Sequence, residues 1–127
     1  MPTLGFEDLE IYRLSERLCD RIWKIVATWN SLAQDTVGKQ LIRAADSIGA
    51  NIAEGTGRGS YQDNRRFARI ARASLYETHH WLRRAFSRRL LDRREATEIK
   101  PTLEELRPRL NAYLKSIGRK GPMTKDK

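Results

Sequence analysis

The feature that most constrains this chain is a recurrence of apolar residues at steps of three and four, found in four separate segments. Such spacing gathers the apolar side chains on one face of an α-helix. No segment shows the alternation of apolar and polar residues that is typical of a strand. The pattern therefore predicts an all-α fold, an antiparallel up-down four-helix bundle within residues 1–117. The predicted helices cover residues 8–29, 37–54, 61–90 and 92–117.

The segments between the predicted helices carry turn and loop signals. Residues 30–38 are polar and are interpreted as a loop, and Gly55 is placed where a helix often ends in a left-handed residue. Pro101 and Pro108 lie seven residues apart on the face opposite the apolar seam, so we expect a kink or a break in the last helix rather than its loss. Residues 118–127 hold two glycines, one proline and four bases, which predicts a disordered basic tail.

Positive charge is concentrated in one part of the chain. The net charge is +9, and residues 58–90 carry nine arginines against Asp63 and Glu77. A basic surface favours anionic partners. Our first hypothesis is a non-enzymatic, self-assembling bundle that binds nucleic acid, RNA first, with low sequence specificity. The candidate phosphate contacts are Arg65, Arg66, Arg69, Arg72, Arg83, Arg84, Arg88 and Arg89.

Two other interpretations of these arginines stay open. They form a solvated face that only keeps the protein soluble, or they serve a protein-interaction scaffold without direct nucleic-acid binding. In the scaffold, the arginines would pair with acids of a neighbouring subunit, such as Glu10, Glu16 and Asp20.

The predicted second helix carries a polar stripe beside its apolar one, rotated by about 110° at 100° per residue. This stripe consists of Gln40, Arg43, Ala44, Ser47, Asn51 and Glu54. One interpretation is a structural hydrogen-bond network in which Glu54 and Glu77 accept from Arg43 and Arg58. The other is a ligand or subunit site. Under the structural interpretation, truncating Asn51 or Glu54 to alanine costs about 1–3 kcal/mol.

The run from Gln40 to Arg58, QLIRAADSIGANIAEGTGR, resembles the hallmark of the four-helix proteins named after the 23S rRNA intervening sequence. Two shorter patterns strengthen this resemblance, which covers about residues 6–117. They are the opening residues Phe6, Leu9 and Tyr12, and the third-helix residues Phe67, Ala71, Ser74, Leu75 and Glu77. The two prolines of the last helix and the many arginines of the third depart from the family pattern.

The resemblance implies a bacterial four-helix bundle that assembles as a homo-oligomeric ring, a homopentamer, and has no enzymatic activity. Some members are encoded inside insertions in 23S rRNA genes, and most have an unknown function. A similar bundle is the accessory protein of diversity-generating retroelements. The implied partners are therefore other copies of the chain, RNA or DNA, and a reverse transcriptase or another protein.

No pattern in the sequence predicts catalysis, a metal site or a cofactor. His79 and His80 are adjacent and point about 100° apart on a helix, and Cys19 has no nearby histidine. Trp23, Trp29 and Trp81 are expected in the core or at an interface rather than as base-stacking platforms. The single cysteine, the acidic N-terminus and the lack of a long apolar run predict a cytoplasmic protein without membrane contact.

Overall fold

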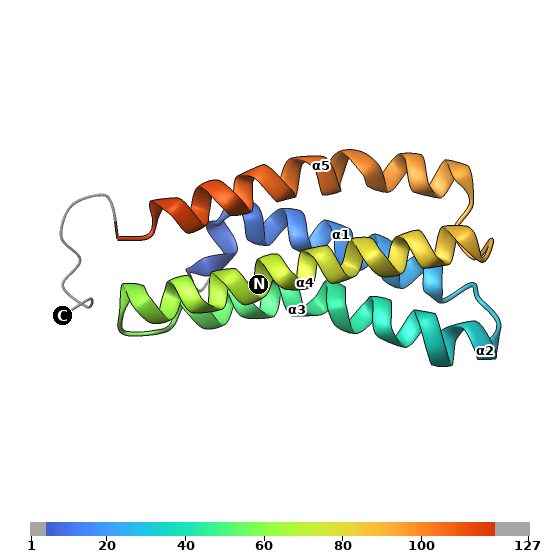
Figure 1. Ribbon diagram of the computed structural model, residues 1–127, viewed down its shortest axis with the longest axis horizontal. Coiled ribbons are helices and arrows are strands. Elements are labelled where there is room, and N and C mark those ends of the chain that lie inside the picture. The colour runs from blue at the N-terminus through green and yellow to red at the C-terminus, as the bar shows by residue number, and fades with distance from the viewer. Residues whose placement is uncertain (1–4, 119–127) are drawn as a thin grey trace.

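The computed structural model of the protein describes residues 5–118. Within that range the chain forms four long helices and no strand, which confirms the predicted all-α, four-helix class. The four helices lie side by side along the long axis of the molecule (Figure 1). They are α1 (Glu10–Val26), α3 (Lys39–Thr56), α4 (Tyr61–Ser87) and α5 (Arg93–Ser116).

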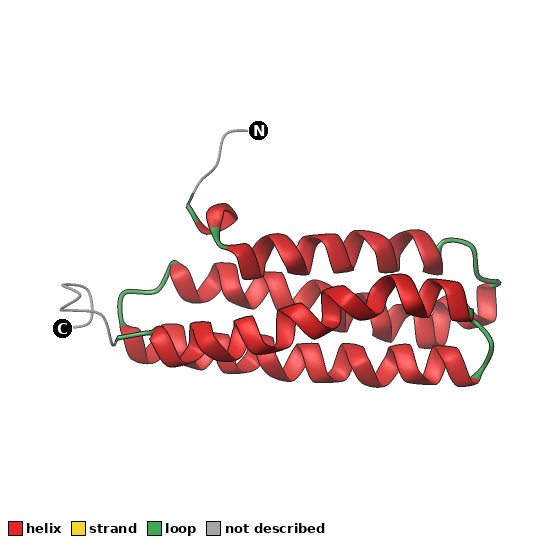
Figure 2. Cartoon of the chain, turned by 90° about the horizontal axis from the view of Figure 1, so that it is seen from above, coloured by secondary structure: helices red, strands yellow, loops and turns green. Residues whose placement is uncertain are grey.

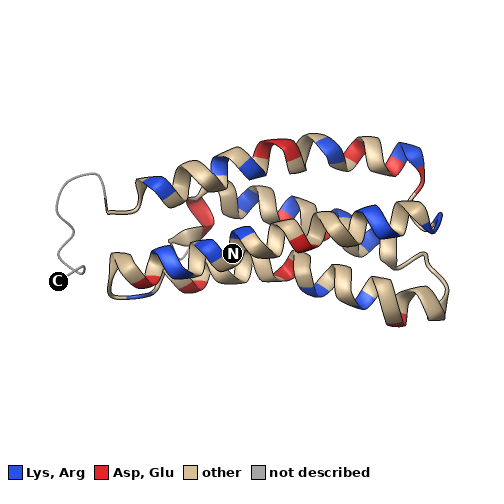
Figure 3. Ribbon diagram, in the orientation of Figure 1, with Lys and Arg blue, Asp and Glu red and all other residues tan. Residues whose placement is uncertain are grey.

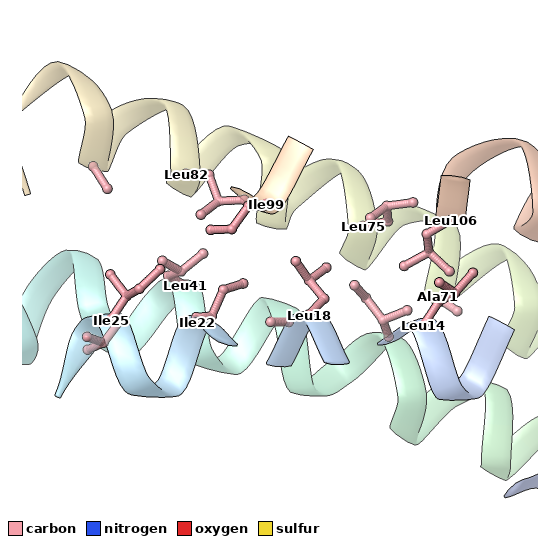
Figure 4. Packing of buried hydrophobic residues seen from close by; sticks show 14 of the residues in the cluster. Leu14, Leu18, Ile22, Ile25, Leu41, Ala71, Leu75, Leu82, Ile99 and Leu106 are labelled. Carbon is pink, nitrogen blue, oxygen red and sulfur yellow. The ribbon is translucent and has the colours of Figure 1, made fainter. Parts of the chain in front are cut away.

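Each long helix packs against two others, so that α3 contacts α1 and α4, and α5 contacts α1 and α4. The predicted apolar seams meet between them (Figure 4). Burying one such leucine or isoleucine contributes roughly 1.5–3 kcal/mol to folding. The largest side chains with 2% exposure or less include Leu14, Leu18, Ile22, Leu41, Ile48, Ile52, Leu75, Leu106 and Leu110.

The prediction that residues 30–38 form a loop is wrong. After a short turn at the end of α1, the chain forms α2 (Ser31–Ala33) and the π-helical turn η2 (Gln34–Gly38), which lead directly into α3 (Figure 2). The polar residues cap these helical turns, because Asn30 Oδ1 accepts the Ala33 N–H at 3.0 Å. Ala33 and Val37 are buried, eight and four residues before Leu41, so the apolar period of α3 starts earlier than predicted.

The predicted helix ends also shift by a few residues. A short 3₁₀ turn, η1 (Phe6–Asp8), precedes α1, which ends at Val26 rather than residue 29. Helix α4 ends at Ser87 rather than residue 90, because Arg89 adopts a left-handed φ of 61°. The Arg89 N–H then bonds Phe86 O at 3.1 Å and the Leu90 N–H bonds Ala85 O at 2.9 Å, which closes the helix end.

Helix α5 starts at a capping box and continues through both prolines. Asp92 Oδ1 accepts the Glu95 N–H at 2.7 Å, and Glu95 Oε1 accepts the Asp92 N–H at 3.0 Å. Pro101 and Pro108 are exposed, as predicted, but the expected break does not occur. On this outer face, water can satisfy the carbonyls that lose their helical partner.

Gly55 lies inside α3, not at a left-handed helix end. It is buried against α4, where an added Cβ would lie 2.5 Å from Asn64 Oδ1 and 3.0 Å from Phe67 Cβ. The missing side chain therefore lets the two helices approach closely. Only Gly118 of the predicted tail falls within the described residues. Among the helices of the described range, none is both long and apolar enough to cross a membrane.

We predict that Gly55→Ala destabilises the protein by about 1–3 kcal/mol, because the new methyl group overpacks the contact between α3 and α4. Gly57→Ala is the matched control, since its Cβ would meet only carbonyl oxygens at 3.6 and 3.8 Å. The control should be neutral or stabilise by up to about 1 kcal/mol. Urea unfolding followed by circular dichroism measures both, and equal stabilities would contradict the close approach.

Candidate nucleic-acid interface

The arginines predicted to contact nucleic acid are spread along α4 and the turn that follows it (Figure 3). The edge of the helix that faces α5 carries Arg65, Arg69, Arg72 and Arg83, at steps of four, three and eleven residues. Arg66, Arg84 and Arg88 lie roughly 100–140° further round the helix. The predicted single basic face is thus two basic stripes, and Arg89 follows them in the turn to α5.

Acidic side chains leave most of this charge uncompensated. Among the eight arginines, only Arg66 forms an ion pair within the described residues, at 3.7 Å from Asp63. Three acids of α1 and α5 are instead bound by arginines of the same two helices. Arg21 pairs with Glu98, and Arg109 pairs with Glu10 at 3.2 Å and with Glu105 at 2.9 Å. The two sides of the bundle therefore differ in charge balance.

Three of the eight arginines have structural contacts. Arg65 Nη1 donates to the Ile117 carbonyl at 3.1 Å, where it caps the C-terminal end of α5. Arg72 Nη1 donates to Asn111 Oδ1 at 3.3 Å, also on α5. Both side chains are half-buried, so removing them would loosen α5 as well as lower the charge. The guanidinium of Arg66 lies over the Phe67 ring, 4.6 Å from its centre, and the guanidinium of Arg58 lies 4.7 Å from the same centre.

A groove of about 350 Å³ lies between α4 and α5, close to the turn that joins them. Its rim carries Arg83 from α4 and Lys100 and Arg107 from α5. Arg107 Nη2 hydrogen-bonds His79 Nδ1 at 3.0 Å, and its guanidinium lies 5.8 Å from the centre of the Tyr76 ring. The remaining lining is mainly apolar and comprises Leu82, Phe86, Leu91, Ala96, Ile99 and Leu103, with Glu104 as its acid.

Sequence reasoning identified only Arg83 of this groove. Lys100 and Arg107 come from a different helix, which the concentration of arginines in residues 58–90 did not indicate. The sequence analysis did not predict Tyr76 and Phe86 as site residues, yet Tyr76 is 50% and Phe86 44% exposed. Their steps of four and three from Arg72 and Arg83 were the available signal.

The polar stripe of α3 joins α3 to α4. Ser47 Oγ and Ser74 Oγ share a hydrogen bond of 2.8 Å between the helices. Asn51 Nδ2 donates to the Ser47 carbonyl at 2.8 Å and to Ser47 Oγ at 2.9 Å. On α4, Thr78 Oγ1 donates to the Ser74 carbonyl at 2.7 Å. Ser47 and Asn51 therefore belong to a network between the two helices, as the structural interpretation expects.

The charged residues of the predicted network do not join the hydrogen-bond network between α3 and α4. Glu54 pairs with Arg58 at 3.3 Å, but both side chains are about half exposed. Glu77 Oε2 accepts from Trp81 Nε1 at 3.2 Å, and no ion pair joins Arg43 to it within the described residues. Gln40, Arg43, Ser47 and Glu77 instead line an open cleft between α3 and α4.

The remaining reactive side chains have ordinary surroundings. Cys19 Sγ donates to the Ala45 carbonyl at 3.0 Å, and burial, aided by nearby Asp46, raises the pKa of the thiol to about 12. The thiol is thus protonated at neutral pH, which disfavours a nucleophilic role. His80 packs edge-on against Trp81 at 4.8 Å. In residues 5–118, no three side chains of the metal-binding types cluster.

The three tryptophans do not share one environment. Trp29 and Trp81 pack partly buried against the core, as predicted. Trp23 is 62% exposed on the outer side of α1, so it lies outside the core, and its expected place at an interface stays a prediction. It lies three residues before Val26, the last buried residue of α1, and is not part of the buried face.

We predict that Asn51→Ala lowers the free energy of unfolding by about 1–3 kcal/mol, because it removes two hydrogen bonds beside a half-buried serine. Glu54→Ala should cost less than about 1 kcal/mol, since an exposed ion pair contributes little. That smaller value corrects the equal loss expected from the sequence. Thermal and chemical unfolding of both variants tests the pair, and an unchanged Asn51→Ala protein would favour a binding role for this residue.

Comparisons with known proteins agree with the architecture. The sequence profile of the family described as 23S rRNA-intervening sequence protein matches residues 7–112. The fold is similar to that of a protein with unknown function from the S23 ribosomal protein family of Bacteroides thetaiotaomicron, with a TM-score of 0.73 and 24% sequence identity. This similarity covers 83% of the present chain and 98% of the other. No curated protein matches the sequence.

Proposed function

The chain belongs to the 23S rRNA-intervening sequence protein family, and from this premise we propose that it is a non-enzymatic, self-assembling bundle that binds nucleic acid. RNA is the first candidate, bound through the basic surface of α4 with low sequence specificity. The observation that carries the proposal is that seven of the eight candidate arginines have no acid partner within the described residues. Glu10, Glu98 and Glu105 of α1 and α5, in contrast, are paired with arginines of those two helices. A cytoplasmic location is part of the proposal and suits a chain with one cysteine.

Uncompensated arginines along a helix suit a phosphate backbone. Each phosphate contact releases a condensed counterion, so many weak contacts add up to useful affinity. Phosphate contacts carry no direct sequence information. No base-reading motif is visible in the sequence, so we expect similar affinity for unrelated sequences.

We further propose that up-down bundles of this chain assemble into a homo-oligomeric ring, with a homopentamer as the expected form. Two observations support an interface at α3 and α4. The open cleft there contains charged Arg43 and Glu77 without an ion pair between them, and Ile70 on α4 is 39% exposed. A ring would repeat the basic stripes around its axis and extend the surface offered to a phosphate backbone.

A protein-interaction scaffold is the alternative function. Its arginines would pair with acids of a neighbouring subunit or of a protein partner such as a reverse transcriptase. Glu10 is already bound by Arg109 of the same chain. Glu16 and Asp20 are exposed and form no ion pair within the described residues, which keeps them available for this role.

We predict that Arg69→Gln, Arg83→Gln and Arg84→Gln combined weaken binding to unrelated RNAs by a similar factor. The side chains of these three form no hydrogen bond or ion pair within the described residues, so the fold should tolerate their loss better than that of Arg65 or Arg72. Three lost phosphate contacts should flatten the slope of log affinity against log salt by roughly two units. Fluorescence anisotropy across a salt series measures both effects.

The matched control removes the same charge from the opposite side of the bundle, with Arg17→Gln, Lys24→Gln and Lys39→Gln combined. All three residues are exposed on α1 and α3. The control should keep most of the salt slope. Absence of nucleic-acid binding by the wild-type protein at ~50 mM salt, where phosphate contacts are strong, would show the proposed function to be wrong.

For the assembly, we predict a mass several times the 14.7 kDa of one chain by light scattering at tens of micromolar. Ile70→Glu should reduce this mass, because a charge would then be buried in the interface. Leu32→Glu is the control, since Leu32 is 76% exposed on α2, away from the cleft. A wild-type monomer would refute the ring.

A further inference from the structure

The edge of α4 beside α5 carries a regular mixture of cations and aromatic rings. Its members follow steps of four, three, four, three, four and three along one side of the helix. At 1.5 Å per residue this stripe is about 30 Å long. It consists of Arg65, Arg69, Arg72, Tyr76, His79, Arg83 and Phe86.

Helix α5 provides the opposite wall and adds two cations. Lys100 and Arg107 lie on the rim of the groove between the helices, and Glu104 is the acid among its lining residues. Arg107 is held by His79 and by the face of Tyr76, and its Nε is buried without a hydrogen-bond partner in the described range. These two contacts fix the orientation of the guanidinium at the rim of the groove.

The floor of the groove is apolar, with Leu82, Leu91, Ile99 and Leu103 among its lining residues. Phe86 borders it and is 44% exposed, and Tyr76, next to Arg107, is 50% exposed. Exposed aromatic rings interleaved with cations are the combination with which proteins hold unpaired bases and their phosphates together. The volume of about 350 Å³ lies within the range of sites that hold small planar ligands.

We propose that the α4–α5 groove, lined by Arg83, Phe86, Lys100 and Arg107, binds single-stranded nucleic acid together with the adjacent Tyr76 and selects it over duplex. This inference rests on the proposed function and adds the class of nucleic acid. Bases stack on Phe86 and Tyr76, while phosphates contact Arg69, Arg83 and Lys100. A duplex cannot use the two rings, because the faces of its bases are covered within the helical stack.

The positive charge of the groove and the length of the basic stripe favour single-stranded nucleic acid over other occupants. The residues after Gly118 include Arg119, Lys120, Lys125 and Lys127 against Asp126, so the end of this chain has the same sign as the groove. An acidic amphipathic helix of another protein would match the rim and floor of the groove. Such a helix would not contact Arg65, Arg69 and Arg72, which continue the stripe beyond the groove lining. The repeating phosphates of a nucleic-acid strand would contact these cations.

The test compares a 20-nucleotide single-stranded RNA without self-complementarity with the same sequence as a duplex, by fluorescence anisotropy on the full chain. We expect the single strand to bind at least tenfold more tightly. Tyr76→Leu and Phe86→Leu combined should lower its affinity at least tenfold and leave the salt slope unchanged, because base stacking is lost and phosphate contacts stay. Duplex binding should hardly change.

Two further variants separate the effect of base stacking on affinity from the effect of charge, and a folding measurement accompanies each variant. Trp23→Leu removes an exposed ring on the far side of the bundle and should leave affinity unchanged. Lys100→Gln keeps both rings and should flatten the salt slope by about 0.7, the value for one phosphate contact of a single strand. Circular dichroism and thermal melting verify that each variant is folded, and a misfolded leucine pair is replaced by each single change.

The outcomes distinguish this inference from the proposed function. Equal affinity for single strand and duplex, with no effect of the combined Tyr76→Leu and Phe86→Leu changes, overturns the proposal that bases stack in the groove. Weaker binding by the triple arginine variant would then still support the proposed function. Absence of any nucleic-acid binding overturns both. A third outcome would assign the groove to a protein partner instead. In that case an acidic amphipathic peptide binds, the combined Tyr76→Leu and Phe86→Leu changes abolish its binding, and single strands are not bound selectively.

Discussion

The close approach of α3 and α4 sets the geometry on which the rest of the molecule depends. Gly55 allows it sterically, since any side chain there would collide with Asn64 and Phe67. The hydrogen bond between Ser47 and Ser74 fastens the same interface with small polar groups. Because this contact fixes the rotation of α4 about its axis, it also decides which edge of α4 meets α5 and where the arginines point.

Helix α5 is fastened differently, and the difference creates the candidate site. Ion pairs from Arg21 and Arg109 hold it to α1, while Arg65 and Arg72 reach it from α4 with single hydrogen bonds. A groove stays open between α4 and α5 near their turn. Its lining carries three cations against the single acid Glu104, which gives the groove an excess of positive charge.

The fold was predictable to a large extent, because apolar periodicity depends only on helix geometry and burial. The four helices, their seams and the family resemblance over residues 7–112 all followed from that pattern and the Gln40–Arg58 motif. The errors arose where local signals have two meanings. Polar residues 30–38 cap helical turns instead of forming a loop, and Gly55 serves a helix contact instead of a helix end. Prolines on the outer face did not interrupt α5.

The sequence by itself determined the helices, the buried faces and the excess of arginine on α4, because each depends on the order of residues within one helix. Only the tertiary structure decided which arginines are unpaired, since acid partners come from helices far apart in sequence. It alone joined Tyr76, Arg83 and Phe86 with Lys100 and Arg107, because a groove between two helices depends on their relative rotation and spacing. Side-chain contacts across the bundle fix both quantities, and no pattern along the chain records them.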